Sequence, residues 1–219
     1  MSRMGGIIDK KEVSAGVETH HGWKTYLSTE EQESVLLEAR LIEQGHQPGC
    51  HRRRDGSALF WASSSGYGVR CKLAELLAAL ESGADPNAEQ SEVVLHLRSG
   101  RPLDLCLDDS KADLAGESLL NNIPVIQMLL DYGADPRLDP LPPLKGVPAC
   151  PLEPVEEARR SAQWGEGSMK AYFSDAYRLM RRAADALDRL ESSPGSEKVT
   201  RDTDDPPGKN CSSEGPTQA

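Results

Sequence analysis

Aromatic residues and long apolar segments are both scarce in this sequence. Only 5% of the 219 residues are aromatic. So few large rings suit helices that stack through leucine and alanine better than a β-sandwich, whose strands favour aromatic and β-branched side chains. No apolar run approaches the roughly 20 residues needed to span a bilayer, and the first residues lack the apolar centre of a signal peptide. These absences indicate a helical protein of the cell interior, cytoplasmic or nuclear.

Cysteine is sparse as well, and its placement argues against a disulfide framework. The five cysteines are scattered, at Cys50, Cys71, Cys106, Cys150 and Cys211. Secreted disulfide-rich domains typically carry an even number of clustered cysteines. We therefore expect free thiols in a reducing compartment, with Cys106 as a small buried apolar residue.

Motifs of common enzymes and metal sites are missing. The chain has no glycine-rich phosphate loop, no Gly-x-Ser-x-Gly turn and no His-Glu-x-x-His helix. His46, Cys50, His51 and Cys71 are zinc-binding residue types, but no Cys-x-x-Cys pair is among them. We interpret these four as incidental, and we predict no catalytic residue, no metal, no cofactor and no small-molecule substrate.

The acidic charge is concentrated in the middle of the chain. The formal net charge is −10, and residues 81–150 hold twelve acidic against five basic residues. An acidic centre repels phosphate backbones, which disfavours nucleic acid as a partner. The one dense basic run, His51-Arg52-Arg53-Arg54, is shorter than most nucleic-acid or localisation clusters. For this run a solvated loop, a protein contact and, least favoured, a nucleic-acid contact stay open.

Two identical tetrads carry most of the positive information. Gly83-Ala84-Asp85-Pro86 and Gly133-Ala134-Asp135-Pro136 each follow an apolar helical run, residues 73–80 and 125–130. Glycine directly after such a run ends the helix, because it lacks the Cβ that clashes at positive φ. Aspartate followed by proline then forms a turn, since aspartate caps local amides and proline cannot continue a helix. The pattern therefore predicts a structural repeat.

A weaker third copy, Gly45-His46-Gln47-Pro48, lies upstream, and the three glycines are 38 and 50 residues apart. With these tetrads the chain resembles the ankyrin repeat, a unit of about 33 residues with a turn and two antiparallel helices. The longer steps require insertions. The resemblance covers roughly residues 36–162.

The family opens its inner helix with Thr-Pro-Leu-His-x-Ala, and three segments resemble this motif. They are Ser57-Ala58-Leu59, Arg101-Pro102-Leu103 and Cys150-Pro151-Leu152. The resemblance implies that the three leucines are buried and that Pro102 and Pro151 occupy the first helical position, where the missing amide of proline needs no partner. Arg101 and Cys150 are weaker caps than threonine, and the family's histidine is absent from all three segments.

Two further helices are predicted at the ends of the stack. Ser28-Thr29-Glu30-Glu31 is typical of a capping box and opens a helix that Gly45 closes, with Val35, Leu36, Ala39 and Ile42 on its buried side. Residues 169–190 predict a long capping helix with one apolar stripe. The stripe contains Phe173, Ala176, Met180, Ala183, Leu187 and Leu190.

The resemblance implies an all-α fold, a short ankyrin-like solenoid of three to four helix pairs between disordered ends. Terminal units of such a stack keep one polar face toward water. The expected units are a flexible segment 1–27, an N-terminal cap unit 28–53, a repeat 54–86, an extended repeat 87–136, a C-terminal cap unit 137–190 and a disordered tail 191–219.

The same resemblance implies a non-catalytic adaptor or scaffold that binds another protein through its turns and inner helices. Val93, Leu95 and Leu97 alternate as in half of a β-hairpin, and Trp61 is either a partner anchor or part of the core. The candidate contact residues are Arg52, Arg53, Arg54, Trp61, Val93, Leu95, His96, Leu97 and Arg101. Two other classes stay open: a small helical enzyme or metal-binding protein that only mimics the repeat spacing, and a regulator acting through its charged tails.

Overall fold

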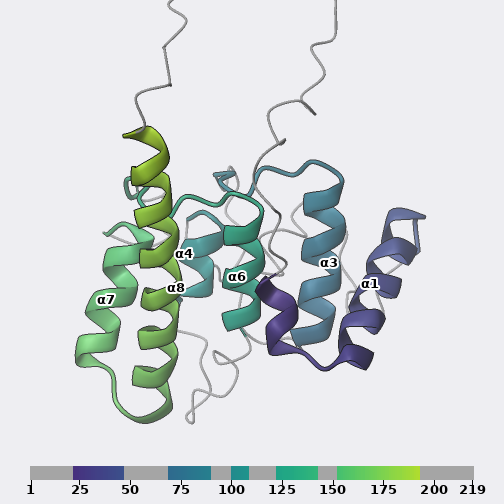
Figure 1. Ribbon diagram of the computed structural model, residues 1–219, viewed down its shortest axis with the longest axis horizontal. Coiled ribbons are helices and arrows are strands. Elements are labelled where there is room, and N and C mark those ends of the chain that lie inside the picture. The colour runs from purple at the N-terminus through teal and green to yellow at the C-terminus, as the bar shows by residue number, and fades with distance from the viewer. Residues whose placement is uncertain (1–21, 47–68, 90–99, 109–121, 143–151, 193–219) are drawn as a thin grey trace, which may run out of the picture.

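The chain forms a row of helices (Figure 1). The computed structural model describes residues 22–46, 69–89, 100–108, 122–142 and 152–192. Its elements are η2 (Gly22–Tyr26, a 3-10 helix), α1 (Thr29–Glu43), α3 (Val69–Glu81), α4 (Pro102–Cys106), α6 (Ile123–Asp131), α7 (Pro154–Trp164) and α8 (Gly167–Glu191). Within these ranges there are six α-helices and no strand, so the predicted all-α class is confirmed for the described part of the chain.

Four of these helices follow one another in space in the order of the sequence. α1 packs against α3, α3 against α6 and α6 against α8, and all four run in the same direction (Figure 1). α7 pairs with α8 on the outside of the row, and the short α4 packs against α6. The helices that end at Gly83 and Gly133 are therefore neighbours, as the repeat pattern predicts.

Three helices of the row end in the same hydrogen-bonded motif. Gly45, Gly83 and Gly133 have φ of 87°, 90° and 90°. After α3, the Gly83 amide donates to the Leu80 carbonyl and the Ala84 amide to the Ala79 carbonyl, both at 3.0 Å. Corresponding pairs of bonds follow α1 and α6. This is the Schellman end, which glycine forms without strain, and the predicted helix ends are confirmed.

The predicted capping box at the start of α1 is also present. The Glu31 amide donates to the Ser28 hydroxyl at 3.3 Å, and the Ser28 amide donates to the Glu31 carboxylate at 2.9 Å. The Ser28 hydroxyl also donates to this carboxylate at 2.9 Å, and the bonds from the Ser28 amide and hydroxyl lower the pKa of Glu31. On the buried side of α1, Val35 and Ala39 are buried, and Leu36 and Ile42 pack against the core.

The N-terminal segment is ordered earlier than predicted. Residues up to 27 were expected to be loose, but residues 22–26 form η2, and Trp23 within it is 0% exposed. η2 packs against α6, and the Trp23 backbone amide donates to the Asp131 carboxylate at 3.3 Å. The prediction was wrong for this segment because one buried indole removes enough apolar surface from water to hold a short helix in place.

Two details of the C-terminal helices also differ from the prediction. α7 begins at Pro154, and Leu152 lies before it, half-buried, so the first helical proline is Pro154 rather than Pro151. The predicted apolar stripe of α8 holds for Phe173, Ala176 and Met180, which are buried. Leu190 is 61% exposed, because the last turns of α8 extend past the neighbouring helices (Figure 1).

Candidate functional site

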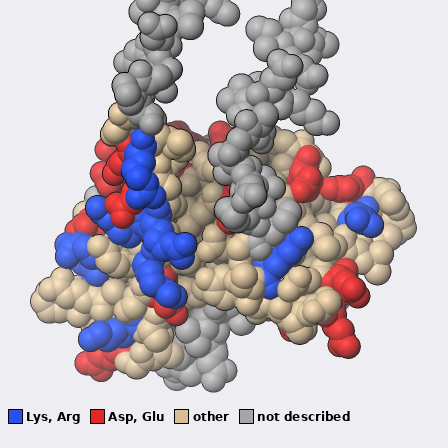
Figure 2. Space-filling model, in the orientation of Figure 1, with Lys and Arg blue, Asp and Glu red and all other residues tan. Residues whose placement is uncertain are grey.

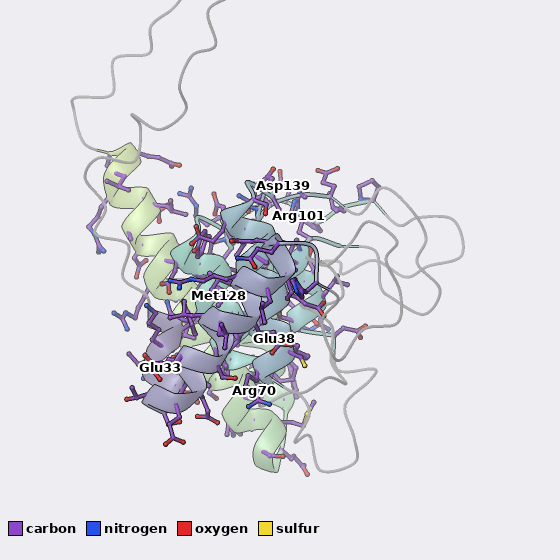
Figure 3. The ribbon with its side chains drawn as sticks, turned by 90° about the vertical axis from the view of Figure 1, so that its right-hand side faces the viewer. Glu33, Glu38, Arg70, Arg101, Met128 and Asp139 are labelled. Atoms are coloured by element: carbon purple, nitrogen blue, oxygen red, sulfur yellow. The ribbon has the colours of Figure 1, made fainter. Side chains whose placement is uncertain are left out.

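Arg101 is the one predicted contact residue that lies in the described part of the chain. Its guanidinium donates to the Asp139 carbonyl at 2.7 Å and pairs with the Glu89 carboxylate at 3.2 Å. Figure 3 shows Arg101 and Asp139 next to each other at one end of the helices. Arg101 therefore connects the start of α4 to the segments after α3 and α6, and its contact with a partner stays a prediction. The others, Arg52, Arg53, Arg54, Trp61, Val93, Leu95, His96 and Leu97, fall outside the described residues.

Arg101 is held at a cap that Asp104 completes. The Arg101 amide donates to the Asp104 carboxylate at 2.8 Å, as the third helical residue does in a capping box, whereas the arginine side chain makes no cap hydrogen bond. A Cβ at Gly100 would come within 2.7 Å of the Asp104 Cβ, so this close approach requires glycine. Leu103, in the same helix, is buried as predicted.

The turns after α3 and α6 are joined directly. The Asn87 side chain donates to the Gly133 carbonyl at 3.1 Å and accepts from the Asp135 amide at 2.8 Å. Just before the two glycines, the Tyr132 hydroxyl donates to the Glu81 carboxylate, and burial together with this hydrogen bond raises the pKa of Tyr132. The two tetrads therefore form one continuous edge.

Arg137 connects the second tetrad to the end of α8. Its guanidinium donates to Asp135 at 2.9 Å, to Asp188 at 2.6 Å and to Glu191 at 2.8 Å. The bond from Arg137 lowers the pKa of Asp135. Hydrogen bonds from an arginine fork to carboxylates fix geometry as well as charge, so the last turn of α8 is aligned with the row.

A cleft of about 660 Å³ lies between α8 on one side and α6 with η2 on the other. We call it the α6–α8 cleft. Its apolar lining comes from Leu130, Leu179, Ala183 and Ala186. The remaining lining residues are Gly22, Thr25, Tyr26, Gln127, Asp131, Arg178, Arg182, Asp185 and Arg189. The cleft therefore combines an apolar part with charged side chains.

The charges along this cleft are unevenly paired. Asp185 pairs with Arg181, which lies outside the cleft, and Arg178 pairs with Asp175, both at 2.9 Å. Asp131 accepts from the Trp23 amide and from the Gln127 side chain.

Arg182 and Arg189 have no ion pair within the described ranges. Figure 2 shows the basic side chains gathered in a column over α8. The α6–α8 cleft thus presents arginines whose charge is not already neutralised by the fold.

A buried polar network lies inside the row, away from this cleft. Lys72, 2% exposed, donates to the Asn122 side-chain oxygen at 2.6 Å. The Asn122 side chain and the Tyr172 hydroxyl both donate to the Cys106 carbonyl, at 3.4 and 2.6 Å. Burial lowers the pKa of Lys72 to about 8, against the opposing effect of Cys106. Since its members come from α3, α4, α8 and the start of α6, we assign the network to the core.

Three further observations bear on function. Within the described ranges, no group of three or more His, Cys, Asp or Glu side chains is placed to hold a metal ion. Among the helices that the structure describes, none combines the length and apolar character that crossing a membrane requires. No protein-family model, curated protein or solved structure matches the chain.

Sequence reasoning missed the α6–α8 cleft because its walls come from distant segments. Arg178, Arg182 and Arg189 lie off the apolar stripe of α8, and they line a cleft with η2, whose residue Trp23 is buried. The spacing of four and seven residues, which places side chains on one helix face, was the available signal.

Proposed function

We propose that this chain is an ankyrin-like repeat protein that binds other proteins as a non-catalytic adaptor or scaffold. The observation that supports the proposal best is the joined edge of the two tetrads. Parallel neighbouring helices end in the same motif, and the side chain after one tetrad bonds the backbone of the next. Each repeat of a solenoid contacts its neighbours in this way.

The physical advantage of such a row is rigidity before binding. Turns that are already hydrogen-bonded to one another lose little conformational entropy when a partner docks on them. Arg101, Asn87 and Arg137 each connect a turn to the neighbouring unit. This arrangement suits a surface for binding a protein, and we place it inside the cell, in the cytoplasm or nucleus, in keeping with the free Cys71 and Cys106.

Proximity labelling in cells tests the proposal. The full chain is compared with a variant in which Val93, Leu95 and Leu97 are changed to serine. We expect the wild type to label a defined set of proteins and the variant to lose part of that set, while its melting temperature stays the same. If the wild type labels no protein above background, the adaptor function is wrong.

Two controls separate the proposal from its alternatives. Deletion of residues 193–219 tests a function carried by the tail: loss of every labelled protein with an unchanged melting temperature would move the function there. Metal analysis of the purified protein tests the metal-binding alternative. Stoichiometric zinc would contradict the expected absence of a metal.

A further inference from the structure

We propose that the α6–α8 cleft is a docking site for an acidic amphipathic peptide segment of a partner protein. The proposal rests on the adaptor function above and names a surface distinct from the predicted turn contacts. The cleft is lined by α6, α8 and η2, whereas the resemblance places the predicted contacts on the turns and inner helices of the expected repeats. The protein would then hold two partners, or two parts of one partner, on different surfaces.

The charge of the cleft selects an acidic ligand. Arg182 and Arg189 are exposed and have no ion pair among the described residues, while the two acids of the lining, Asp131 and Asp185, already accept hydrogen bonds or an ion pair within the fold. A carboxylate that enters the cleft can therefore pair with these two guanidinium groups without breaking an existing ion pair. Guanidinium–carboxylate pairs form bidentate hydrogen bonds, so position as well as charge is recognised.

The spacing of the arginines matches a helical peptide. Arg182 and Arg189 are seven residues apart on α8, which is about 10 Å along the helix axis. Two acids seven residues apart on a second helix have the same separation and share one face of that helix. A short acidic segment can therefore reach both arginines.

The apolar part of the cleft distinguishes a peptide from a nucleic acid. Leu130, Leu179, Ala183 and Ala186 line the space beside the arginines, and they suit leucine-like side chains on the same segment that carries the acids. Helix-in-groove recognition uses such a combination of apolar anchors and flanking charges. A phosphate backbone carries no apolar side chains beside its charges, so it would leave this apolar lining uncovered.

The test measures binding of a fluorescein-labelled peptide to the full-length protein by fluorescence anisotropy. The probe is an amphipathic peptide with glutamates seven residues apart and leucines on the same face. Its controls are the same peptide with glutamine in place of glutamate, and a single-stranded RNA oligonucleotide. We expect the glutamate peptide to bind, the glutamine peptide to bind about tenfold more weakly, and the affinity to fall as salt is raised.

A matched pair of variants locates the binding. Arg182→Glu with Arg189→Glu reverses the two unpaired charges of the cleft. Arg40→Glu with Arg160→Glu makes the same change in net charge at exposed positions on α1 and α7 that do not line the cleft. Melting curves of both variants establish that they fold. We expect the cleft variant to lose about tenfold or more in affinity and the control variant to stay within about twofold of wild type.

The possible results are distinct. Equal loss in both variants, or equal binding of the glutamate and glutamine peptides, overturns the site. So does tighter binding of the RNA than of the glutamate peptide, which would assign the cleft to nucleic acid. Because the peptide assay does not use the cellular partners, its failure leaves the labelling result intact. Conversely, an absence of labelled proteins refutes the adaptor function even where the peptide binds.

Discussion

The turns after α3 and α6 share their sequence and local geometry but differ in how they reach their neighbours. In each, glycine has φ of 90°, and the aspartate carboxylate accepts the amide two residues later, at 2.9 Å in both cases. The residue after the proline differs: Asn87 in the first turn and Arg137 in the second. Asn87 bonds backbone atoms of the next tetrad, and Arg137 bonds carboxylates at the end of α8.

Asn87 and Arg137 bond different groups because the two turns have different neighbours. The first tetrad lies next to a second copy of itself, so a short amide side chain reaches the backbone of that copy. The second tetrad lies next to the end of α8, which closes at Ser192 without a tetrad, and a longer side chain is needed. The tetrad thus determines the local turn, and the residue after it determines the connection to the neighbouring unit.

The largest expected effect comes from removing the packing of η2 against α6, the helix that precedes the second turn. Trp23 packs with η2 against α6, and Trp23→Ala should lower the free energy of unfolding by about 3–5 kcal/mol, through lost burial and a cavity. Hydrogen exchange should show the amides of α6 losing protection before those of α1. Trp23→Phe should cost less, since most of the buried area remains. If α1 and α6 lose protection together, η2 does not support α6 selectively.

Substitution of the tetrad glycines should affect both turns equally. A Cβ at Gly83 or Gly133 meets no atom within 4 Å, so alanine adds only the backbone cost of positive φ, about 1–2 kcal/mol. Denaturant titration of Gly83→Ala and Gly133→Ala should give the same loss. Asparagine, which tolerates this conformation better, should cost less at both positions. Unequal losses would show that the two turns are not equivalent even locally.

Alanine at Asn87 or at Arg137 should lower the stability of the protein with a different salt dependence at each turn. Asn87→Ala removes two hydrogen bonds and should cost about 1 kcal/mol at any salt concentration. Arg137→Ala should destabilise the protein at low salt and do so less at high salt, because exposed ion pairs are screened. Chemical denaturation with urea, repeated with added sodium chloride, measures both. If the stability of both variants responds to salt in the same way, the two turns are not distinguished by a neutral connection at Asn87 and an ionic one at Arg137.

The smallest expected effect is a pH dependence confined to the second turn. The pKa of Asp135 is lowered in the folded state, so its contribution is fully present above its unfolded pKa of about 3.9 and is lost as pH falls through the lower folded value. The stability difference between wild type and Arg137→Ala should therefore shrink in strong acid. Urea titrations between about pH 5 and pH 2 test this window. If the stability difference between wild type and Arg137→Ala stays constant over this pH range, the Asp135–Arg137 pair does not contribute to it.

The local features of the fold were predictable from short stretches of sequence. Glycine after an apolar run and serine three residues before glutamate act through neighbouring backbone atoms, so the ends of α1, α3 and α6 and the cap at Ser28 follow from the sequence directly. The burial of Leu103 followed from the repeat pattern in the same way.

Features that depend on distant segments were not predictable in this way. The burial of Trp23, the connection from Arg137 to α8 and the α6–α8 cleft each require knowing which helices become neighbours. Leu190 continues the apolar spacing of α8 but has no neighbouring helix to cover it, so periodicity alone overestimated its burial. Lys72 is the converse case, a charged residue type in the core, because Asn122 offers its amine a partner.

Lys72 also gives the protein an internal chemical reporter. Lys72 is 2% exposed, so burial keeps acylating reagents away from its amine while the helices are packed, and separation of the helices exposes it. Lys170, exposed on α8, reacts whether the core is open or closed. The ratio of acylation at these two lysines, read by mass spectrometry, therefore reports how often the helices separate, without a probe being introduced into the chain.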